Sequence, residues 1–436
     1  MKNWFDTSSG LVRVRFHFGM MGFILAALMA QGQDLPGHNS AAETNATIPE
    51  EFRPLYKSLD ETLRQDRQTY PFAKGQARPL VAGNLGMAWS MFDPAAPDSP
   101  RWKDLLATLD AFKSMKMDVV FVQIEAPDLA RGVQGQRIEF YQRLAREIHS
   151  RNMKLYVEHF INVPFEPNLP SGAHADKGLP AVKDLKDDPQ GRQEFLNILE
   201  QENALIYREI KPDFLTLIDE PRITINLMLH LTFSPDELAN WVGEVTTHLK
   251  STGASPNTLL GAGALIWEPE EIALKFAQQT NLDYVDIHLY YLTYKGEDLA
   301  SKSATLVRKI REARPNMKIT IGEAWLSKFG TAGPKMANSQ ELFLRDVYSF
   351  WSPLDEQFLA LLLGLAQKEN ISVIAPSGSQ YFFDYYTFGD AEVAHLPPGV
   401  GKRISASWDK AVESIRSHRL SSTGKALSGI LHNDEK

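Results

Sequence analysis

The stretch FLTLIDEP, residues 214–221, decides how the chain is interpreted. Apolar residues typical of a buried strand run directly into Asp219, Glu220 and Pro221. Ionised carboxylates are costly to bury and are rarely buried without a partner. Two adjacent acids at the end of a buried strand therefore indicate a functional site. They also direct attention to the residues that end the other apolar runs of the chain.

Seven further apolar runs have the length and composition of buried strands, at residues 79–89, 117–127, 153–161, 258–267, 282–291, 317–325 and 371–378. Between them lie segments whose apolar residues recur with helical spacing, at 101–115, 140–151, 195–210, 235–253, 270–280, 300–315 and 357–370. Strand and helix alternating eight times predict a single (β/α)8 barrel. The alternative is a doubly wound open sheet. A nucleotide-binding sheet would carry G-x-G-x-x-G after its first strand, where this chain has NLGMAW at 84–89.

The first thirty residues differ from the rest of the chain. Basic residues precede an apolar run at 16–30 that ends in small residues, which is the order of a secretory signal peptide cleaved after Ala30. The alternative is an uncleaved anchor, but the run is shorter than the roughly 20 residues that span a bilayer. We therefore expect a secreted or periplasmic protein with no stable membrane span after cleavage.

The remaining boundaries follow from composition. Residues 31–75 are expected to form a linker and lead-in segment, 76–425 the barrel, and 426–436 a C-terminal tail.

A hydrophobic content of 43% and a charged content of 23% are those of a soluble globular protein. The net charge of −8 argues against nucleic acid as the main partner, and the absence of cysteine excludes disulfides.

Two acids stand at matching places in the expected barrel. Glu220 closes the fourth apolar run and Glu323 closes the seventh. Barrel enzymes carry their chemistry at the carboxyl ends of the strands, and strands four and seven face each other across the mouth. Two carboxyls held there, one protonated and one ionised, are what cleavage of a glycosidic bond requires. No histidine pair has metal-ligand spacing, and no G-x-S-x-G occurs, so neither a metal nor a serine nucleophile is indicated.

The combined motifs resemble the clan A superfamily of retaining glycoside hydrolases, whose members are (β/α)8 barrels. The matching stretches are Asp219-Glu220-Pro221 on strand four, His288-Leu289-Tyr290 on strand six and Gly322-Glu323 on strand seven. VEHFIN at 157–162, which contains His159, is similar to the third strand of cellulase- and mannanase-like members.

The resemblance implies a role for each matching residue. Glu220 would be the general acid/base, Glu323 the nucleophile, and Tyr290 a hydrogen-bond donor to that nucleophile. The substrate-binding residues would be Asp219, His159, His288, Tyr290 and Trp325. The implied substrate is an oligosaccharide or polysaccharide with β-linked sugars, and the implied reaction needs no cofactor.

Some positions depart from the pattern of the superfamily. Asp219 stands where Asn is usual, Gln123 stands where many members carry Arg, and the eighth strand lacks the usual Trp. These departures leave open a non-catalytic or transglycosylating barrel that binds glycans. A metal-assisted barrel hydrolase is a further alternative, with ligands drawn from Glu125, Glu158, His159 and Asp219.

Geometry distinguishes these possibilities. A retaining pair should hold its carboxyl groups about 5 to 5.5 Å apart, against roughly 6.5 to 9.5 Å for an inverting pair. We expect the Tyr290 hydroxyl within hydrogen-bond reach of Glu323, and Glu220 as the member of the pair that holds a proton near neutral pH. The aromatic stretch YFFDYYTFGD, residues 381–390, is expected to pack under the barrel rim rather than form a wall of the substrate site.

Overall fold

The computed structural model describes most of the chain from Ile48 onward. The described residues are 48–86, 88, 99–126, 129, 134–161, 189–222, 225, 231–291, 299–328, 346–396 and 400–433. The expected signal peptide, residues 1–30, and the following linker up to residue 47 lie outside them. Within the described residues no helix is both long enough and apolar enough to cross a membrane.

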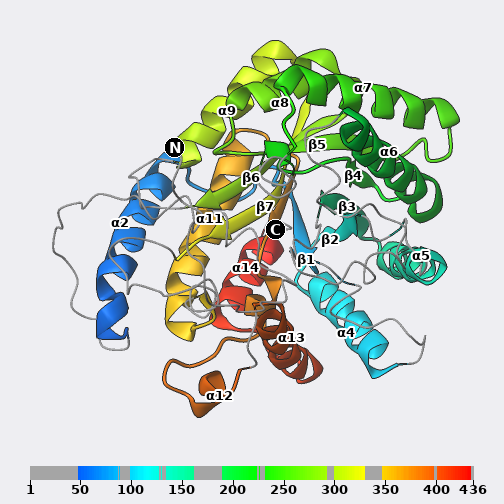
Figure 1. Cartoon of the computed structure of the whole chain (residues 1–436). Helices are drawn as coiled ribbons and strands as arrows, with labels where there is room; N and C mark the ends of the chain where they lie inside the picture. The colour runs from blue at the N-terminus through cyan, green and yellow to red at the C-terminus, as the bar shows by residue number, and fades with distance from the viewer. Residues whose placement is uncertain are drawn as a thin grey trace, which may run out of the picture.

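Eight parallel strands form a closed barrel in which each strand pairs with its neighbours in sequence order (Figure 1). The barrel closes where β1 pairs with β8. The strands are β1 (Leu80–Asn84), β2 (Val119–Ala126), β3 (Lys154–Ile161), β4 (Phe214–Thr216), β5 (Leu259–Leu265), β6 (Tyr284–Tyr291), β7 (Lys318–Leu326) and β8 (Val373–Pro376). Each lies within or nearly within an apolar run found in the sequence, so the prediction of a (β/α)8 barrel is confirmed.

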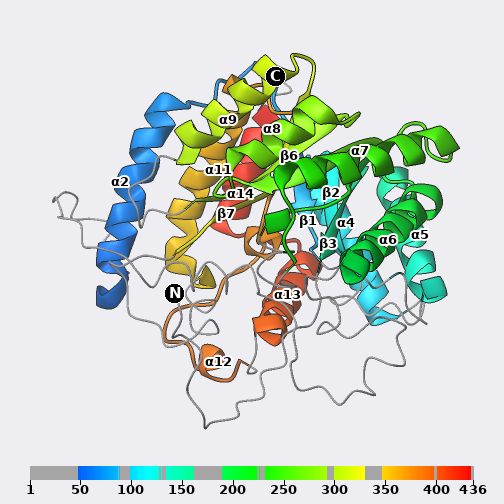
Figure 2. The ribbon, with the colours of Figure 1, turned by 45° about the horizontal axis from the view of Figure 1, so that its top comes forward.

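Helices surround the barrel, as a second view shows (Figure 2). The helices that alternate with the strands are α4 (Pro100–Ser114), α5 (Gln134–Ser150), α6 (Pro189–Leu205) with η4 (Ile206–Ile210), α7 (Pro235–Thr252), α8 (Glu270–Gln279), α9 (Leu299–Ala313) and α11 (Ser352–Lys368). Shorter or additional helices are η1 (Glu50–Phe52), α2 (Arg53–Thr69), η6 (Ser349–Trp351), η7 (Ser379–Phe382), α12 (Ala391–Ala394), α13 (Val400–Arg416) and α14 (Ser422–Asn433).

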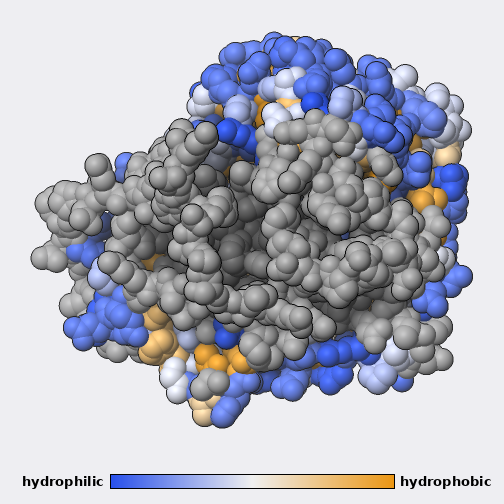
Figure 3. Space-filling model, viewed as in Figure 1, coloured by the Kyte–Doolittle hydropathy of each residue, from blue (hydrophilic) through white to orange (hydrophobic). Residues whose placement is uncertain are grey.

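Local sequence explains why these helices begin and end where they do. In α7, the Ser234 side chain accepts from the backbone N–H of Glu237, whose side chain accepts from the backbone N–H of Ser234. This capping box satisfies backbone donors at the start of the helix, and the left-handed Gly253 ends it. Over α7, α8 and α9 the outer surface is mainly hydrophilic (Figure 3).

Two apolar cores hold the barrel together. The larger lies between the strands and the helices. The smaller fills the barrel interior and consists of Ala82, Val119, Phe121, Tyr156, Phe214, Tyr284, Val373 and Ala375. This smaller core supports the charged residues that face the barrel interior nearer the carboxyl ends of the strands.

Packed structure extends beyond both expected boundaries of the barrel. The lead-in segment contains α2, which packs against α11 and buries Leu55, Leu59 and Leu63 completely. Each such leucine contributes about 1.5–3 kcal/mol of apolar burial. At the other end α14 also packs against α11 and continues past residue 425, with Leu427 and Leu431 buried. Both end helices are therefore part of the barrel body.

Candidate active site

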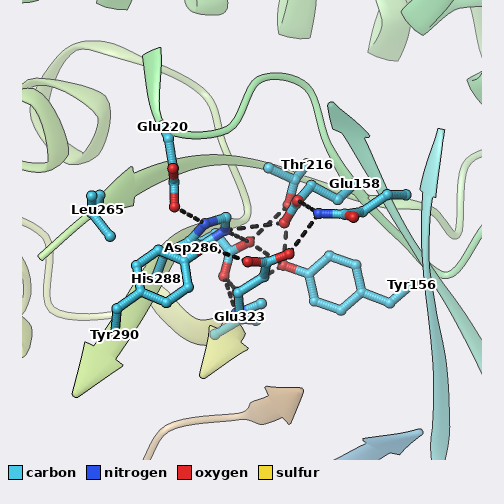
Figure 4. A network of polar contacts seen from close by, with 12 residues as sticks. Tyr156, Glu158, Thr216, Glu220, Leu265, Asp286, His288, Tyr290 and Glu323 are labelled. Carbon is cyan, nitrogen blue, oxygen red and sulfur yellow. Dashed lines mark hydrogen bonds and ion pairs between the residues drawn. The ribbon is translucent and has the colours of Figure 1, made fainter. Parts of the chain in front are cut away.

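The structure gathers charged side chains inside the carboxyl end of the barrel (Figure 4). Glu158 comes from β3, Glu220 from the segment after β4, His288 from β6 and Glu323 from β7. These four side chains are between 0% and 7% exposed. Burial of so many charges requires partners for each, and the contacts below supply them.

A β-bulge turns Glu323 toward the barrel interior. On β7 the interior residue Thr320 pairs with Asp286 of β6, but the next pair is Glu323 with His288, so β7 holds one extra residue. Regular alternation from Thr320 would have pointed Glu323 outward, since successive side chains lie on opposite faces. Gly322 sits in the bulge, where a Cβ would come within 2.3 Å of the Asp286 carboxylate. Glycine is therefore required before Glu323.

The backbone also places Glu220 unusually. Its φ is +36°, in the left-handed region that non-glycine residues avoid, and Pro221 follows it. Such a conformation costs about 1–3 kcal/mol and is found most often at functional sites. The Glu220 side chain reaches His288, whose Nδ1 lies 2.8 Å from Glu220 Oε1.

Glu220 and Glu323 lie close together. A carboxylate oxygen of each and a ring nitrogen of His288 all lie within 4.8 Å of one another. This separation agrees with the expected approach of the two acids across the mouth.

His288 connects three acids. Its Nε2 lies 3.0 Å from Glu158 and 3.5 Å from Asp286, while its Nδ1 faces Glu220. Burial lowers the pKa of His288, but the charge of Glu158 and the hydrogen bonds of Asp286, Glu158 and Glu220 outweigh it and raise that pKa well above its usual value. A doubly protonated ring then donates from Nδ1 to Glu220, while Nε2 forms an ion pair with Glu158. His288 is fully buried, so it acts on a substrate only through these acids.

Glu323 is held from two sides. The Tyr290 hydroxyl donates to Oε2, as expected, and the Gln123 side-chain amide donates to Oε1 at 2.6 Å. Burial and the charge of Glu158 nevertheless raise the pKa of Glu323 to about 8. In the free chain this pKa favours the neutral form of Glu323 near pH 7. The expectation that Glu220 donates the proton to the leaving group stays a prediction.

Asp219 is fully buried beside this group. Burial first, and then the charges of Glu158 and Glu220, raise the pKa of Asp219 well above its usual value. A protonated carboxyl donates one hydrogen bond and accepts others, as an Asn side chain does. Asp219 can therefore supply the donor that the usual Asn supplies, although its residue type differs.

The Asp286 carboxylate holds this cluster of charged side chains in place. Its carboxylate accepts from the Tyr156 hydroxyl at 2.7 Å, the Thr320 hydroxyl at 2.7 Å and the backbone N–H of Gly322 at 2.6 Å. Burial raises its pKa, but these hydrogen bonds and His288 more than offset burial and lower the pKa of Asp286 below its usual value. Asp286 is thus the ionised residue that fixes the bulge and the His288 ring.

The structure places His159 away from this group. Glu158 faces the barrel interior, so the adjacent His159 faces outward, where its Nε2 lies 2.9 Å from Glu202 of α6. Both residues are fully buried. The expected substrate contact of His159 is therefore replaced by a link between β3 and α6. The metal set drawn from Glu125, Glu158, His159 and Asp219 fails to converge for the same reason.

A cavity of about 200 Å³ opens beside Glu323. Tyr290 and Trp325, both expected to bind substrate, line it, and their rings meet edge to face at 6.3 Å. Five of the ten residues in the aromatic stretch 381–390 are buried, whereas residues 387–390 are exposed, and Tyr381 lines the cavity. Further lining residues were not predicted as site residues, among them Asn84, Gln123, Asp346, Gln380 and Trp408.

Two groups of described residues could hold a metal ion. They are Glu158, Asp286 and His288, and Glu220, His288 and Glu323. Both depend on His288, whose two nitrogens already face Glu220 and Glu158. A metal ion would have to displace one of these contacts, so the arrangement fits hydrogen bonding better than coordination.

No protein-family model and no curated protein matches the sequence. Solved structures do match. The chain is similar in shape to barrel glycoside hydrolases. A glycoside hydrolase family 5 mannosidase from Rhizomucor miehei shares 15% identity, covering 78% of this chain and 95% of that one, with a TM-score of 0.44.

Two other solved structures are similarly distant. An exo-β-1,4-mannosidase from Opitutaceae bacterium strain TAV5 shares 14% identity at a TM-score of 0.46, with 82% of this chain and 63% of that chain covered. A GH113 β-1,4-mannanase shares 13% identity at a TM-score of 0.43, with 77% of this chain and 99% of that chain covered. These likenesses are too distant to assign an activity, which has to be argued from the site itself.

Proposed function

We propose that the protein is a retaining glycoside hydrolase that acts on β-linked sugars. The observation that carries the proposal is the approach of Glu220 and Glu323 across the barrel mouth, with carboxylate oxygens within 4.8 Å. The Tyr290 hydroxyl and the Gln123 amide orient Glu323, while His288 orients Glu220. Two acids with separate hydrogen-bond partners suit the two separate roles of this reaction.

The reaction would take two steps. A carboxylate oxygen of Glu323 bonds to the anomeric carbon as the glycosidic C–O bond breaks, and the leaving oxygen takes the proton of Glu220. Glu220 then removes a proton from a water, whose oxygen bonds to the anomeric carbon and releases Glu323. The anomeric configuration of the product is the same as that of the substrate.

The first step sets a condition on protonation. Glu323 must be ionised to attack, yet its pKa of about 8 favours the neutral form at pH 7. The pair shares one proton, which has to reside on Glu220 in the reactive form. Activity should therefore fall as pH rises above about 8, because the pair then loses the proton that Glu220 has to donate.

The test is hydrolysis of a panel of aryl β-glycosides and β-linked polysaccharides by the wild type, with Glu323→Gln and Glu220→Gln as matched variants. We expect the wild type to cleave at least one neutral substrate, and proton NMR to show the β-anomer first. Either substitution should lower kcat by at least about 10⁴-fold while the fold persists. Initial release of the α-anomer, or full activity in either variant, would contradict the proposal.

We also propose that the protein is exported, as residues 1–30 predict. N-terminal sequencing of protein recovered outside the cytoplasm should begin near Gln31. A recovered chain that still begins at Met1 would contradict cleavage.

A further inference from the structure

The cavity beside Glu323 lies on one side of the barrel mouth. Its described lining residues come from β1 and the residues just after it, β2, β6, β7, the segment before η6, the segment after β8 and helix α13, and none comes from β3, β4 or β5. Glu220 follows β4, so the cavity extends from Glu323 away from the acid that protonates the leaving group. A sugar in this cavity is therefore the one attacked by Glu323, and the rest of the substrate leaves toward Glu220.

The size of the cavity limits what it can hold. Its volume of about 200 Å³ is below the roughly 300–1,000 Å³ of sites for drug-sized ligands. A space of this size suits one sugar ring rather than two. Trp325, Tyr381 and Trp408 supply aromatic surface, which suits the apolar faces of a sugar ring, and Asn84 and Gln380 supply polar groups for its hydroxyls.

Helix α13 closes the far side of the cavity. Ile404 and Trp408 of this helix line it, and Trp408 is only 5% exposed. The helix is fixed at its end, where Arg416 Nε lies 2.9 Å from Asp104 of α4 and Ser414 donates to Asp384 at 2.6 Å. Figure 2 shows α13 as an addition next to the ring of helices that alternate with the strands. A fixed wall at this position stops a chain from continuing past the attacked sugar.

The charge of the cavity selects against anions. Its described lining includes the carboxyls of Glu323 and Asp346 but no Lys, Arg or His. Asp346 is only 1% exposed. A sugar carboxylate, sulfate or phosphate would enter next to these two acids and would find no cationic partner among the described lining residues, which is unfavourable in a buried site.

We propose that this cavity binds a single uncharged sugar at the end of a chain, so that the protein removes terminal sugars one at a time. The inference rests on the proposed glycosidase function and adds to it the mode of attack and the charge class of the substrate. Trp408 and Ile404 of α13 are the residues that determine this specificity.

The test uses neutral β-linked oligosaccharides of mannose, glucose and galactose that carry a fluorescent label at the reducing end. The full-length protein should shorten a labelled chain by one unit at a time and release monosaccharide as the sole unlabelled product. The viscosity of the matching polymer should change little while reducing ends accumulate. Labelled fragments from the middle of the chain, or a rapid loss of viscosity, would overturn the inference while leaving the glycosidase proposal intact.

Variants separate the role of the wall from general damage. Ile404→Trp places a bulky ring in the cavity and should lower kcat/KM for an aryl monoglycoside by at least about 100-fold. Ile430→Trp makes the same change at a half-buried position of α14 outside the cavity, and its kcat/KM should stay within about threefold of the wild type. Trp408→Ala should allow internal cleavage of oligosaccharides. Equal activity of the two isoleucine variants would contradict the role of the cavity.

A binding measurement covers the case in which no substrate is cleaved. That result would remove the proposed function but not yet the sugar site. Neutral monosaccharides should then raise the Tm of Glu323→Gln, whereas uronic acids should not. Failure of every neutral monosaccharide to bind, or preferential binding of uronic acids, would overturn the inference.

Discussion

The replacement Gln123→Met tests how the site controls Glu323. The Gln123 amide donates to Glu323 Oε1 at 2.6 Å and to Glu158 Oε1 at 2.9 Å, and its side chain is buried. Met has nearly the same length and no donor. The change therefore removes a hydrogen bond to the ionised nucleophile while leaving the space filled.

The size of the effect follows from that single hydrogen bond. A hydrogen bond to a charged group contributes about 1.5–3 kcal/mol, and about 1.4 kcal/mol corresponds to one pH unit. Without it the pKa of Glu323, already about 8 because of burial and Glu158, rises further. The basic limb of the activity profile, where the pair loses its shared proton, should move up by about one to two pH units. At pH 7 kcat/KM should fall about 10- to 100-fold, and the loss should shrink at higher pH.

The assay is kcat/KM for an aryl glycoside between pH 5 and pH 11. The wild-type profile should fall above a limb near 8, and the Gln123→Met profile should fall only at higher pH. The control is Gln142→Met on α5, which loses a bond to the Glu209 carbonyl at 3.1 Å far from the site and should leave the profile unchanged. An activity loss that is equal at every pH, with the limb unmoved, would refute the reasoning.

Three further changes have expected outcomes. The pKa of the buried Glu323 carboxyl is about 8 in the folded chain and 4.5 in the unfolded chain, so its contribution to stability is complete below pH 4.5 and is lost as pH rises through 8. Glu323→Gln should therefore unfold at higher denaturant concentration than the wild type at pH 9. The gain in free energy of unfolding should reach roughly 3–5 kcal/mol, and equal stability at pH 9 would contradict it. Asp219→Asn should keep kcat/KM within about tenfold, because Asp219 is protonated; a loss of several orders of magnitude would show that its charge is needed. Tyr290→Phe should lower kcat/KM about 10- to 100-fold and move the basic limb to higher pH. An unmoved limb would exclude the Tyr290 hydroxyl as a donor to the ionised nucleophile.

Apolar runs and their spacing were sufficient to predict the barrel and both acids. FLTLIDEP and its seven counterparts each contain, or nearly contain, one strand, and parallel strands bring their carboxyl ends to one mouth. The outward direction of His159 was also accessible from the sequence. Glu158 and His159 are adjacent on one strand, so only one of them can face the barrel interior.

Other features depend on contacts between distant segments. The extra residue in β7 is visible only when Thr320 and Glu323 are paired with β6, although Gly322 is a signal that a close contact exists there. The protonation of Glu323 depends on burial and on Glu158 of a different strand. The cavity wall of α13 lies outside the strand–helix repeat, so no periodic pattern indicates that Trp408 faces the site.

The central claim is that Glu323 is the nucleophile of a retaining glycosidase. The most direct measurement is mass spectrometry of peptides from protein incubated with a 2-deoxy-2-fluoro aryl glycoside of the sugar that the protein hydrolyses. We predict one added fluorosugar per chain, attached to the peptide that contains Glu323 and absent from Glu323→Gln. Attachment to another residue such as Glu158, or turnover to the inverted anomer with no covalent adduct, would contradict the account.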